Sequence, residues 1–235
     1  MRITTHSPFL TLLTRFGLMN SALVREDDGL TLVDTGMGGS APAILKAAAS
    51  LGAGPIRRIV LTHAHDDHVG SLDALHAALP ETEVLISARD ARLLRGDLTL
   101  DPAEPQTLLR GGLSGAKTTP TWQLRLDGTE RVGSLHVIAA PGHTPGHIAL
   151  FNPRDGTLLC GDAFQTVSGV SVSSERRLLF PLTAFATWHA PTALQTASAL
   201  ADLHPTRLVP GHGRVVEQPE AAMRQAVRRA TGARA

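Results

Sequence analysis

Thr62-His63-Ala64-His65-Asp66-Asp67-His68 is the stretch that decides the fold of this chain, because it places five side chains that can bind a metal within seven residues. It follows the apolar run 59–61, Ile-Val-Leu, which predicts a β-strand. In an extended segment residues i and i+2 point the same way, so His63 and His65 can bind one metal ion. The turn that follows can direct Asp67 and His68 toward a second ion. The stretch therefore predicts a metal site at the end of a strand.

Three further segments supply partners for this stretch: Pro141-Gly142-His143, Gly161-Asp162 and Pro210-Gly211-His212. A catalytic zinc takes about three protein ligands and keeps one position for water. The candidates divide into one set of His63, His65 and His143, and another of Asp67, His68 and His212. Asp162 can bridge both ions, because a carboxylate has two oxygens. The pattern predicts a two-metal hydrolytic site with Asp67 and Asp162 as its catalytic carboxylates, and ions roughly 3.5–4 Å apart.

Composition limits the class of protein. The chain has 235 residues, of which 43% are hydrophobic, 18% are charged and 3% are aromatic, and Tyr is absent. This length suits one large domain, and we expect a single domain over residues 1–235. A net charge of +1 gives no bulk attraction to nucleic acid or membrane, and one cysteine excludes an internal disulfide. Residues 1–6 lack the order of a signal peptide. We therefore expect a cytoplasmic protein with a small-molecule substrate, and a homodimer stays open.

The pattern along the chain predicts strands and helices in both halves. We expect a hairpin at 21–34 and another at 148–160, and helices at 41–51, 69–79, 88–95, 192–203 and 219–230. Ser40 is the expected N-cap of the first helix. Residues 96–121 are expected to form a long surface loop, and residues 165–187 to be irregular. Each half delivers a strand that ends in a Gly/His/Asp loop, which favours a two-sheet sandwich with the site along one edge.

The order of these motifs resembles the metallo-β-lactamase superfamily. His63-x-His65-x-Asp67-His68 is followed in order by His143, Asp162 and His212, and Leu32-Val33-Asp34-Thr35-Gly36 matches the early Asp-x-Gly-type turn. The resemblance implies an α/β (α+β) fold, a four-layer αββα sandwich. It also implies a di-metal hydrolase, usually with zinc, in which hydroxide between the metals is the nucleophile. Asp34, by the same resemblance, orients a ligand histidine, and Asp67 can hand a proton to the leaving group.

The branch within the superfamily is less sharply defined. His68 after Asp67 and the bridging Asp162 resemble glyoxalase II and the N-acyl homoserine lactonases. Those lactonases often use an active-site Tyr, which this chain lacks, and glyoxalase II holds glutathione with a C-terminal region that has little counterpart after His212. We predict a hydrolase with two Zn²⁺ ions (Fe or Mn are alternatives) that cleaves a small ester-like bond, a lactone first and a thioester second. A mononuclear iron sulfur dioxygenase shares the motif and is the alternative from another class.

The segment 165–190 holds the only concentration of aromatic residues. It could form an apolar lid over an acyl chain, with core packing as the alternative. The residues expected to contact substrate are Phe180, Phe185, Trp188 and His189. We expect Cys160 to pack as a small apolar residue, and His147 to support its loop by hydrogen bonding.

Overall fold

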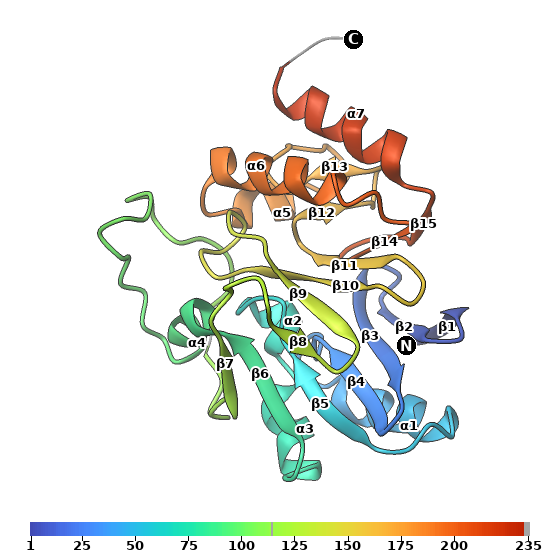
Figure 1. The fold of residues 1–235 in the computed structure, drawn as a ribbon. Helices are drawn as coiled ribbons and strands as arrows, with labels where there is room; N and C mark the ends of the chain where they lie inside the picture. The colour runs from blue at the N-terminus through green and yellow to red at the C-terminus, as the bar shows by residue number, and fades with distance from the viewer. Residues whose placement is uncertain (114, 233–235) are drawn as a thin grey trace.

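Two β-sheets packed face to face form the centre of the computed structural model, which describes residues 1–113 and 115–232. The first sheet has seven strands in the order β1-β2-β3-β4-β5-β6-β7, and the second has six in the order β15-β14-β11-β10-β9-β8. A two-stranded sheet, β12-β13, lies beside the second. Helices cover the outer faces of both sheets (Figure 1).

The strands of the first sheet are short and consecutive in the chain: β1 (Arg2–Ser7), β2 (Leu10–Arg15), β3 (Met19–Glu26), β4 (Gly29–Val33), β5 (Ile56–Val60), β6 (Glu83–Ser87) and β7 (Trp122–Leu124). The second sheet contains β8 (Arg131–Val132), β9 (Leu135–Ala139), β10 (Ile148–Asn152), β11 (Thr157–Gly161), β14 (Arg207–Pro210) and β15 (Val216–Glu217). The small sheet is β12 (Phe164–Gln165) with β13 (Ser171–Val172).

The helices fall into two groups along the chain. The first group is α1 (Ala41–Ser50), α2 (Asp66–Val69), α3 (Leu72–Ala78) and α4 (Ala88–Leu94), and the second is α5 (Leu182–Ala186), α6 (Ala190–Ala201) and α7 (Glu220–Ala230). One apolar cluster joins α1, α3 and α4 to the first sheet, another fills the space between the sheets, and a third joins α6 and α7 to the second sheet. The expected four-layer αββα sandwich is confirmed.

Alternation along the strands explains why both faces of each sheet are covered. In β3, Ala22 and Val24 belong to the cluster between the sheets, whereas Leu23 belongs to the helix-covered cluster. In β10, Ile148 and Leu150 point between the sheets and Ala149 points to the other side. Because successive side chains of a strand point to opposite faces, these apolar runs require cover on both sides.

The carboxyl ends of four strands meet at one edge of the sandwich. β4 pairs with β5 in parallel, and β11 pairs with β14 in parallel. Asp34, Thr62, Asp162 and Gly211 come directly or almost directly after these four strands. This topology gathers the polar segments of both sheets at a single edge, while the apolar clusters lie beneath them.

Several local expectations differ from the structure. The predicted helix 69–79 starts too early, because α2 ends at Val69 and the helix that follows, α3, begins at Leu72. Residues 165–187 are not irregular throughout, since they include β13 and α5, which are too short to show a periodic pattern. Ser40 does not cap α1 with its side chain; its hydroxyl donates to Met37 O at 2.8 Å and accepts from Arg15 Nη1 at 2.7 Å.

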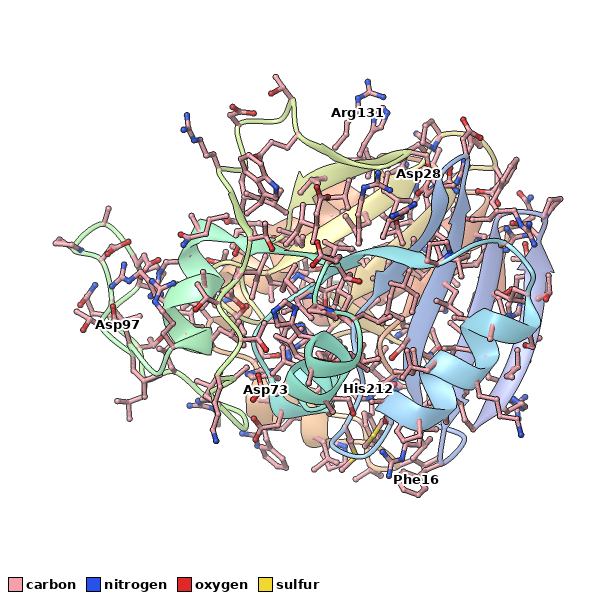
Figure 2. All side chains as sticks on the ribbon, turned by 90° about the horizontal axis from the view of Figure 1, so that it is seen from below. Phe16, Asp28, Asp73, Asp97, Arg131 and His212 are labelled. Carbon is pink, nitrogen blue, oxygen red and sulfur yellow. The ribbon has the colours of Figure 1, made fainter. Side chains whose placement is uncertain are left out.

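The long loop between α4 and β7 matches its prediction. Among its described residues, 96–113 and 115–121, none belongs to a helix or a strand. Figure 2 shows Asp97 on the part of this loop that projects from the body of the molecule. Within the described residues, no helix combines the length and apolar character needed to cross a membrane.

The space between the sheets should carry much of the stability. Leu150 is fully buried there, so Leu150→Ala should lower the free energy of unfolding by about 2–5 kcal/mol through lost burial and a residual cavity. Leu108 is 85% exposed, so Leu108→Ala should change it by less than about 0.5 kcal/mol. Denaturant unfolding monitored by circular dichroism measures both, and equal effects would contradict this account of the core.

Candidate metal centre

Three histidines at the edge of the sandwich direct ring nitrogens to one point. His63 and His65 follow β5, and His143 follows β9 from the second sheet. His63 Nε2 lies 3.1 Å from His65 Nδ1, which lies 3.0 Å from His143 Nε2. All three side chains are buried. We call them the three-histidine group.

Hydrogen bonds behind the rings fix which nitrogen of each histidine carries the proton. Thr62 Oγ1 donates to Asp34 Oδ2 at 2.8 Å, so at 3.0 Å from His63 Nδ1 it accepts a hydrogen bond. Thr187 Oγ1 donates to Thr183 O at 2.7 Å and likewise accepts from His143 Nδ1 at 3.0 Å. A hydroxyl has one proton, so its second partner must be the donor.

His65 is oriented by the main chain. Its Nε2 lies 2.8 Å from the carbonyl oxygen of Arg110 in the long loop, and a carbonyl can only accept. Gly111 lies so close that a Cβ there would be 2.3 Å from His65 Nε2. The inward nitrogens of the three-histidine group therefore all present lone pairs. Burial, reinforced by neighbouring histidines, lowers the pKa of His63 well below its ordinary value, and burial likewise lowers the pKa of His143 and of His65.

A second group lies beside the first and contains carboxylates. His212 Nε2 is 3.1 Å from both Asp67 Oδ2 and Asp162 Oδ2. His68 Nε2 is 3.4 Å from Asp162 Oδ1 and 4.0 Å from Asp67 Oδ2. We call Asp67, His68 and His212 the mixed group. Asp162 Oδ2 is also 3.4 Å from His143 Nε2, so this carboxylate contacts both groups.

In the mixed group the pKa values of the histidines are raised, whereas those of the three-histidine group are lowered. Burial by itself would lower the pKa of His212, but Asp162 and Asp67 raise it to about 9. Burial also opposes protonation of His68, yet Asp34, Asp162 and Asp67 raise its pKa well above the ordinary value. For Asp162 the charges of His212 and His68 outweigh burial, and its pKa falls well below the ordinary value. In the metal-free chain, His68 and His212 are therefore protonated, and their protons lie where a metal ion would bind.

The donor set fits divalent cations. His68 Nε2 and Asp162 Oδ1 are buried and lie 3.4 Å apart, but neither makes a well-formed hydrogen bond to a described residue, which is costly unless a ligand satisfies them. Ligand nitrogens and oxygens come close enough to share an ion in both groups. Imidazole and carboxylate are the ligands that zinc and similar metals take. The structure thus brings together all seven residues expected as ligands.

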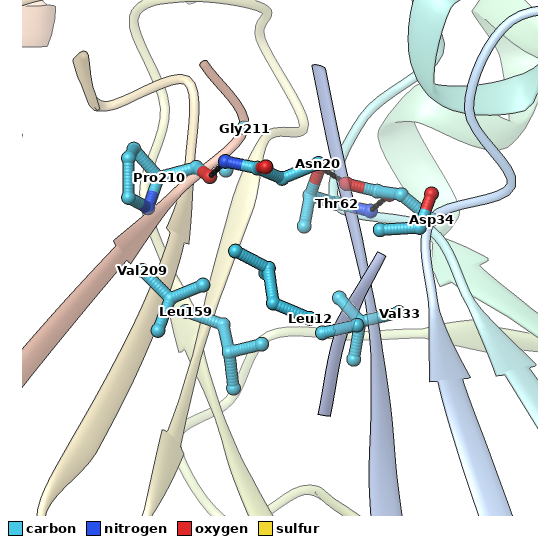
Figure 3. Close-up of a pocket in the computed structure, with 12 residues that line it drawn as sticks. Leu12, Asn20, Val33, Asp34, Thr62, Leu159, Val209, Pro210 and Gly211 are labelled. Carbon is cyan, nitrogen blue, oxygen red and sulfur yellow. Dashed lines mark hydrogen bonds between the residues drawn. The ribbon is translucent and has the colours of Figure 1, made fainter. Parts of the chain in front are cut away.

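Asp34 supports both groups from beneath. It follows β4 with a positive φ of 59°, and its carboxylate accepts hydrogen bonds from Thr62 N at 2.8 Å and Thr62 Oγ1 at 2.8 Å. Its Oδ2 also lies 2.7 Å from His68 Nδ1, leaving His68 Nε2 free to face Asp162. Figure 3 shows Asp34 and Thr62 above a cavity of about 20 Å³ between the sheets.

Asn20 holds the His212 turn against the first sheet. Its Nδ2 donates to Pro210 O and Gly213 O, each at 2.9 Å, and its main-chain N–H donates to Gly211 O at 2.9 Å. The contact between Asn20 and Gly211 is drawn in Figure 3. A residue of β3 in one sheet therefore fixes the position of a histidine that follows β14 in the other.

A second cavity, of about 80 Å³, opens over the two groups. His65, Asp67, His143, Asp162 and His212 contribute to its lining, as do Gly111 and Gly112 of the long loop. The rest of the lining is Met19, Phe180, Leu182, Thr183 and Ala186. The ring of Phe180 lies 5.2 Å from that of His212, measured between centroids. The cavity thus joins polar groups to an apolar wall.

Of the four residues expected to contact substrate, only Phe180 lines this cavity. Phe185 is half exposed and lies under the guanidinium of Arg176. Trp188 is buried, and its indole N–H donates to Thr107 O at 3.0 Å in the long loop. His189 is the N-cap of α6, with Nδ1 2.7 Å from Thr192 Oγ1. The main-chain N–H groups of Trp188 and His189 donate to His143 O and Gly142 O, so this segment supports a ligand loop.

The sequence predicts structural roles for two other residues, His147 and Cys160. His147 Nε2 accepts a hydrogen bond from Asp162 N at 3.0 Å, so His147 holds the backbone of the shared carboxylate. Burial lowers the pKa of His147 to about 3, which keeps that nitrogen free to accept. Cys160 is fully buried, and burial raises the pKa of its thiol to about 12.

Sequence reasoning missed the groups that orient the histidines. Thr62 stands directly before His63 in the quoted stretch, so its position was a usable signal. Thr187 lies 44 residues from His143 in the chain, and nothing in its neighbourhood marks it. The partner of His65 is a backbone carbonyl, which every residue possesses, so no side-chain pattern could have identified Arg110.

Comparison with known proteins agrees with this architecture. Residues 14–212 match the model of the metallo-beta-lactamase superfamily. The chain is 44% identical over 232 residues to the uncharacterized protein YobT of Bacillus subtilis, covering 98% of this chain and 99% of YobT. It is 32% identical to the probable metallo-hydrolase YflN of the same organism, covering 81% of this chain and 78% of YflN. A hydroxyacylglutathione hydrolase of Thermosynechococcus vestitus is 34% identical over 119 residues, 51% of this chain and 38% of that protein.

Solved structures give the same result. A metallo-beta-lactamase from Pontibacter korlensis superposes with a TM-score of 0.74 at 19% identity, covering 98% of both chains. TTHA1623 in a di-iron-bound form superposes with a TM-score of 0.63 at 26% identity, covering 94% of this chain and 97% of that one. The sequence match, the sandwich and the two groups of metal-binding side chains lead to one conclusion: the chain belongs to the metallo-beta-lactamase superfamily and is a metal-dependent hydrolase.

Proposed function

We propose that the protein is a two-zinc hydrolase of small ester-like substrates, with a lactone as the preferred class. The observation that carries the proposal is the pairing of a neutral three-histidine group with a mixed group of two histidines and one carboxylate, connected through the carboxylate of Asp162. One set of three ligands leaves room for water on its ion, and a shared carboxylate suits a pair of ions that act together. Iron or manganese could use the same donors.

Bound metal ions would supply an activated water and positive charge for a substrate carbonyl. The residues of the chain prepare the surroundings for that chemistry. The three-histidine group, oriented by Thr62, Thr187 and Arg110 O, holds neutral donors in place. Asp67 lines the cavity, and its side chain is 31% exposed. Burial alone would raise the pKa of Asp67, but His68 and His212 hold it well below its ordinary value. The ionised carboxylate can therefore accept a proton from the attacking water and pass it to a leaving oxygen.

The cavity indicates the kind of substrate. Its volume of about 80 Å³ suits a small reacting group, and Phe180, Leu182 and Ala186 offer an apolar wall beside it. An acyl lactone has both features, a compact ester and an apolar tail. A thioester hydrolase is the second candidate, favoured by the likeness to hydroxyacylglutathione hydrolase over about half of this chain. A mononuclear iron sulfur dioxygenase would leave the mixed group without an ion.

Metal content is the first test. We expect two metal ions per chain in protein purified without chelator, measured by elemental analysis. Because His68 and His212 hold protons in the metal-free chain at pH 7, zinc should displace protons as it binds. Titration in weakly buffered solution with a pH indicator should show this release, and zinc should raise Tm. One iron per chain would favour the dioxygenase instead.

The shared carboxylate gives the second test. Asp162→Asn keeps the size of the side chain but removes its charge, so affinity for both ions should fall. Turnover should fall at least about 100-fold, because even outer partners of metal ligands contribute about 10–100-fold. Cys160→Ser is the neighbouring control, and its affinity for metal should match that of the wild-type protein. Full metal occupancy and normal rates in Asp162→Asn would disprove the bridging role.

The substrate wall gives the third test. In a series of acyl lactones, each added methylene that reaches Phe180 should strengthen binding up to about fourfold, from about 0.8 kcal/mol per buried methylene. Phe180→Ala should flatten this dependence of KM on chain length, whereas Phe185→Ala should preserve it. If S-lactoylglutathione reacts much faster than every lactone, the thioesterase assignment replaces the lactonase. If the metal-loaded protein hydrolyses neither class, the ester proposal fails.

A further inference from the structure

Asp90 is a buried carboxylate that the proposed chemistry leaves unused. It lies in the first turn of α4 and is fully buried. Its own main-chain N–H donates to Ser87 Oγ, the N-cap of the helix, at 3.0 Å. In the usual capping arrangement an acidic residue at this position reaches back to the N-cap N–H. The carboxylate of Asp90 instead turns away from its helix.

Three hydrogen bonds join Asp90 to two loops. Oδ2 accepts from Ala64 N at 3.0 Å and from Thr144 Oγ1 at 2.7 Å, and Oδ1 accepts from Gly146 N at 2.8 Å. All three partners are donors, as an ionised carboxylate requires. A Cβ at position 146 would lie 2.6 Å from Asp90 Oδ1, so the approach depends on glycine there.

Two of these three donors are adjacent in the chain to histidines of the three-histidine group. Ala64 stands between His63 and His65, and Thr144 directly follows His143. One side chain therefore ties together the two segments that supply the whole three-histidine group, although these segments extend from different sheets. The mixed group has other supports, since Asp34 contacts His68 and Asn20 holds the turn of His212. Burial raises the pKa of Asp90, and the three donors oppose that rise.

We infer that Asp90 is a positioning residue for the metal ion of the three-histidine group, and that it does not serve the mixed group. It sets the separation of the His63–His65 and His143 loops, and it places a negative charge behind three neutral ligands. This inference rests on the two-site arrangement proposed above.

Replacement of Asp90 by asparagine tests the inference with little change in size. The NH₂ end of the asparagine amide is a donor. It would face either the Gly146 N–H or the donors of Ala64 and Thr144, so at least one of the present hydrogen bonds would be lost. A competition titration of Zn²⁺ against a chromophoric chelator should show one site weakened by about 10- to 100-fold in Asp90→Asn, with the other unchanged.

Asp73→Asn is the matched control. Asp73 also accepts hydrogen bonds from two main-chain N–H groups and a threonine hydroxyl, those of Lys117 and Thr118, but it joins no ligand loop. It should retain both wild-type affinities. Thr144→Val removes the hydroxyl that donates to Asp90, so it should weaken the same site as Asp90→Asn, but by a smaller factor. Thr144→Ser keeps a hydroxyl and should have the wild-type zinc affinity at that site. The threonine pair keeps the inference testable if Asp90→Asn folds poorly.

Imidazole ¹⁵N NMR identifies the affected site. In Asp90→Asn, the zinc-dependent shifts of His63, His65 and His143 should need more zinc than those of His68 and His212. Equal weakening of both groups, or none, would overturn the inference. A wild-type protein that binds only one ion would refute the two-metal proposal instead, and Asp90 would still be judged by the signals of the three-histidine group.

Discussion

Face-to-face packing of the two sheets is the constraint on which the whole site depends. The mixed group takes Asp67 and His68 from the first sheet and His212 from the second, and the three-histidine group is divided in the same way. Neither group exists until the apolar residues between the sheets are packed. Asn20 and Asp34 show how closely the two are linked, since both lie at the ends of core strands and reach directly to ligand segments.

The two groups differ in how they prepare for an ion. The three-histidine group is neutral because burial disfavours charge there, and its outer hydrogen bonds leave lone pairs facing one another. In the mixed group, the carboxylates of Asp67 and of the adjoining Asp162 and Asp34 keep the two imidazoles protonated. A cation therefore relieves repulsion between lone pairs at one position and replaces protons at the other. Such a difference would give the two ions unequal affinities and unequal dependence on pH.

The sequence was informative where chemistry resides in side chains at fixed spacing. The sandwich and the clustering of the seven ligand candidates above Asp34 could be predicted, because His and Asp at strand ends are distinctive. The outer contacts could not, since Thr187 is remote from His143 in the chain and Asp90 resembles an ordinary acidic residue at the start of a helix. The placement of Trp188 also escaped prediction: its indole N–H needed a partner, and the long loop supplied one at Thr107 O.

The contact between His65 and the carbonyl of Arg110 has a consequence for how this enzyme varies among relatives. A main-chain oxygen is retained through every amino-acid exchange, so position 110 can change freely in evolution and still orient the histidine. Alanine scanning would pass over it for the same reason. What the contact cannot tolerate is a change in loop length, because one inserted residue would displace the oxygen. Insertions and deletions between α4 and β7, rather than point mutations, are therefore the changes that would reach the metal centre from this side.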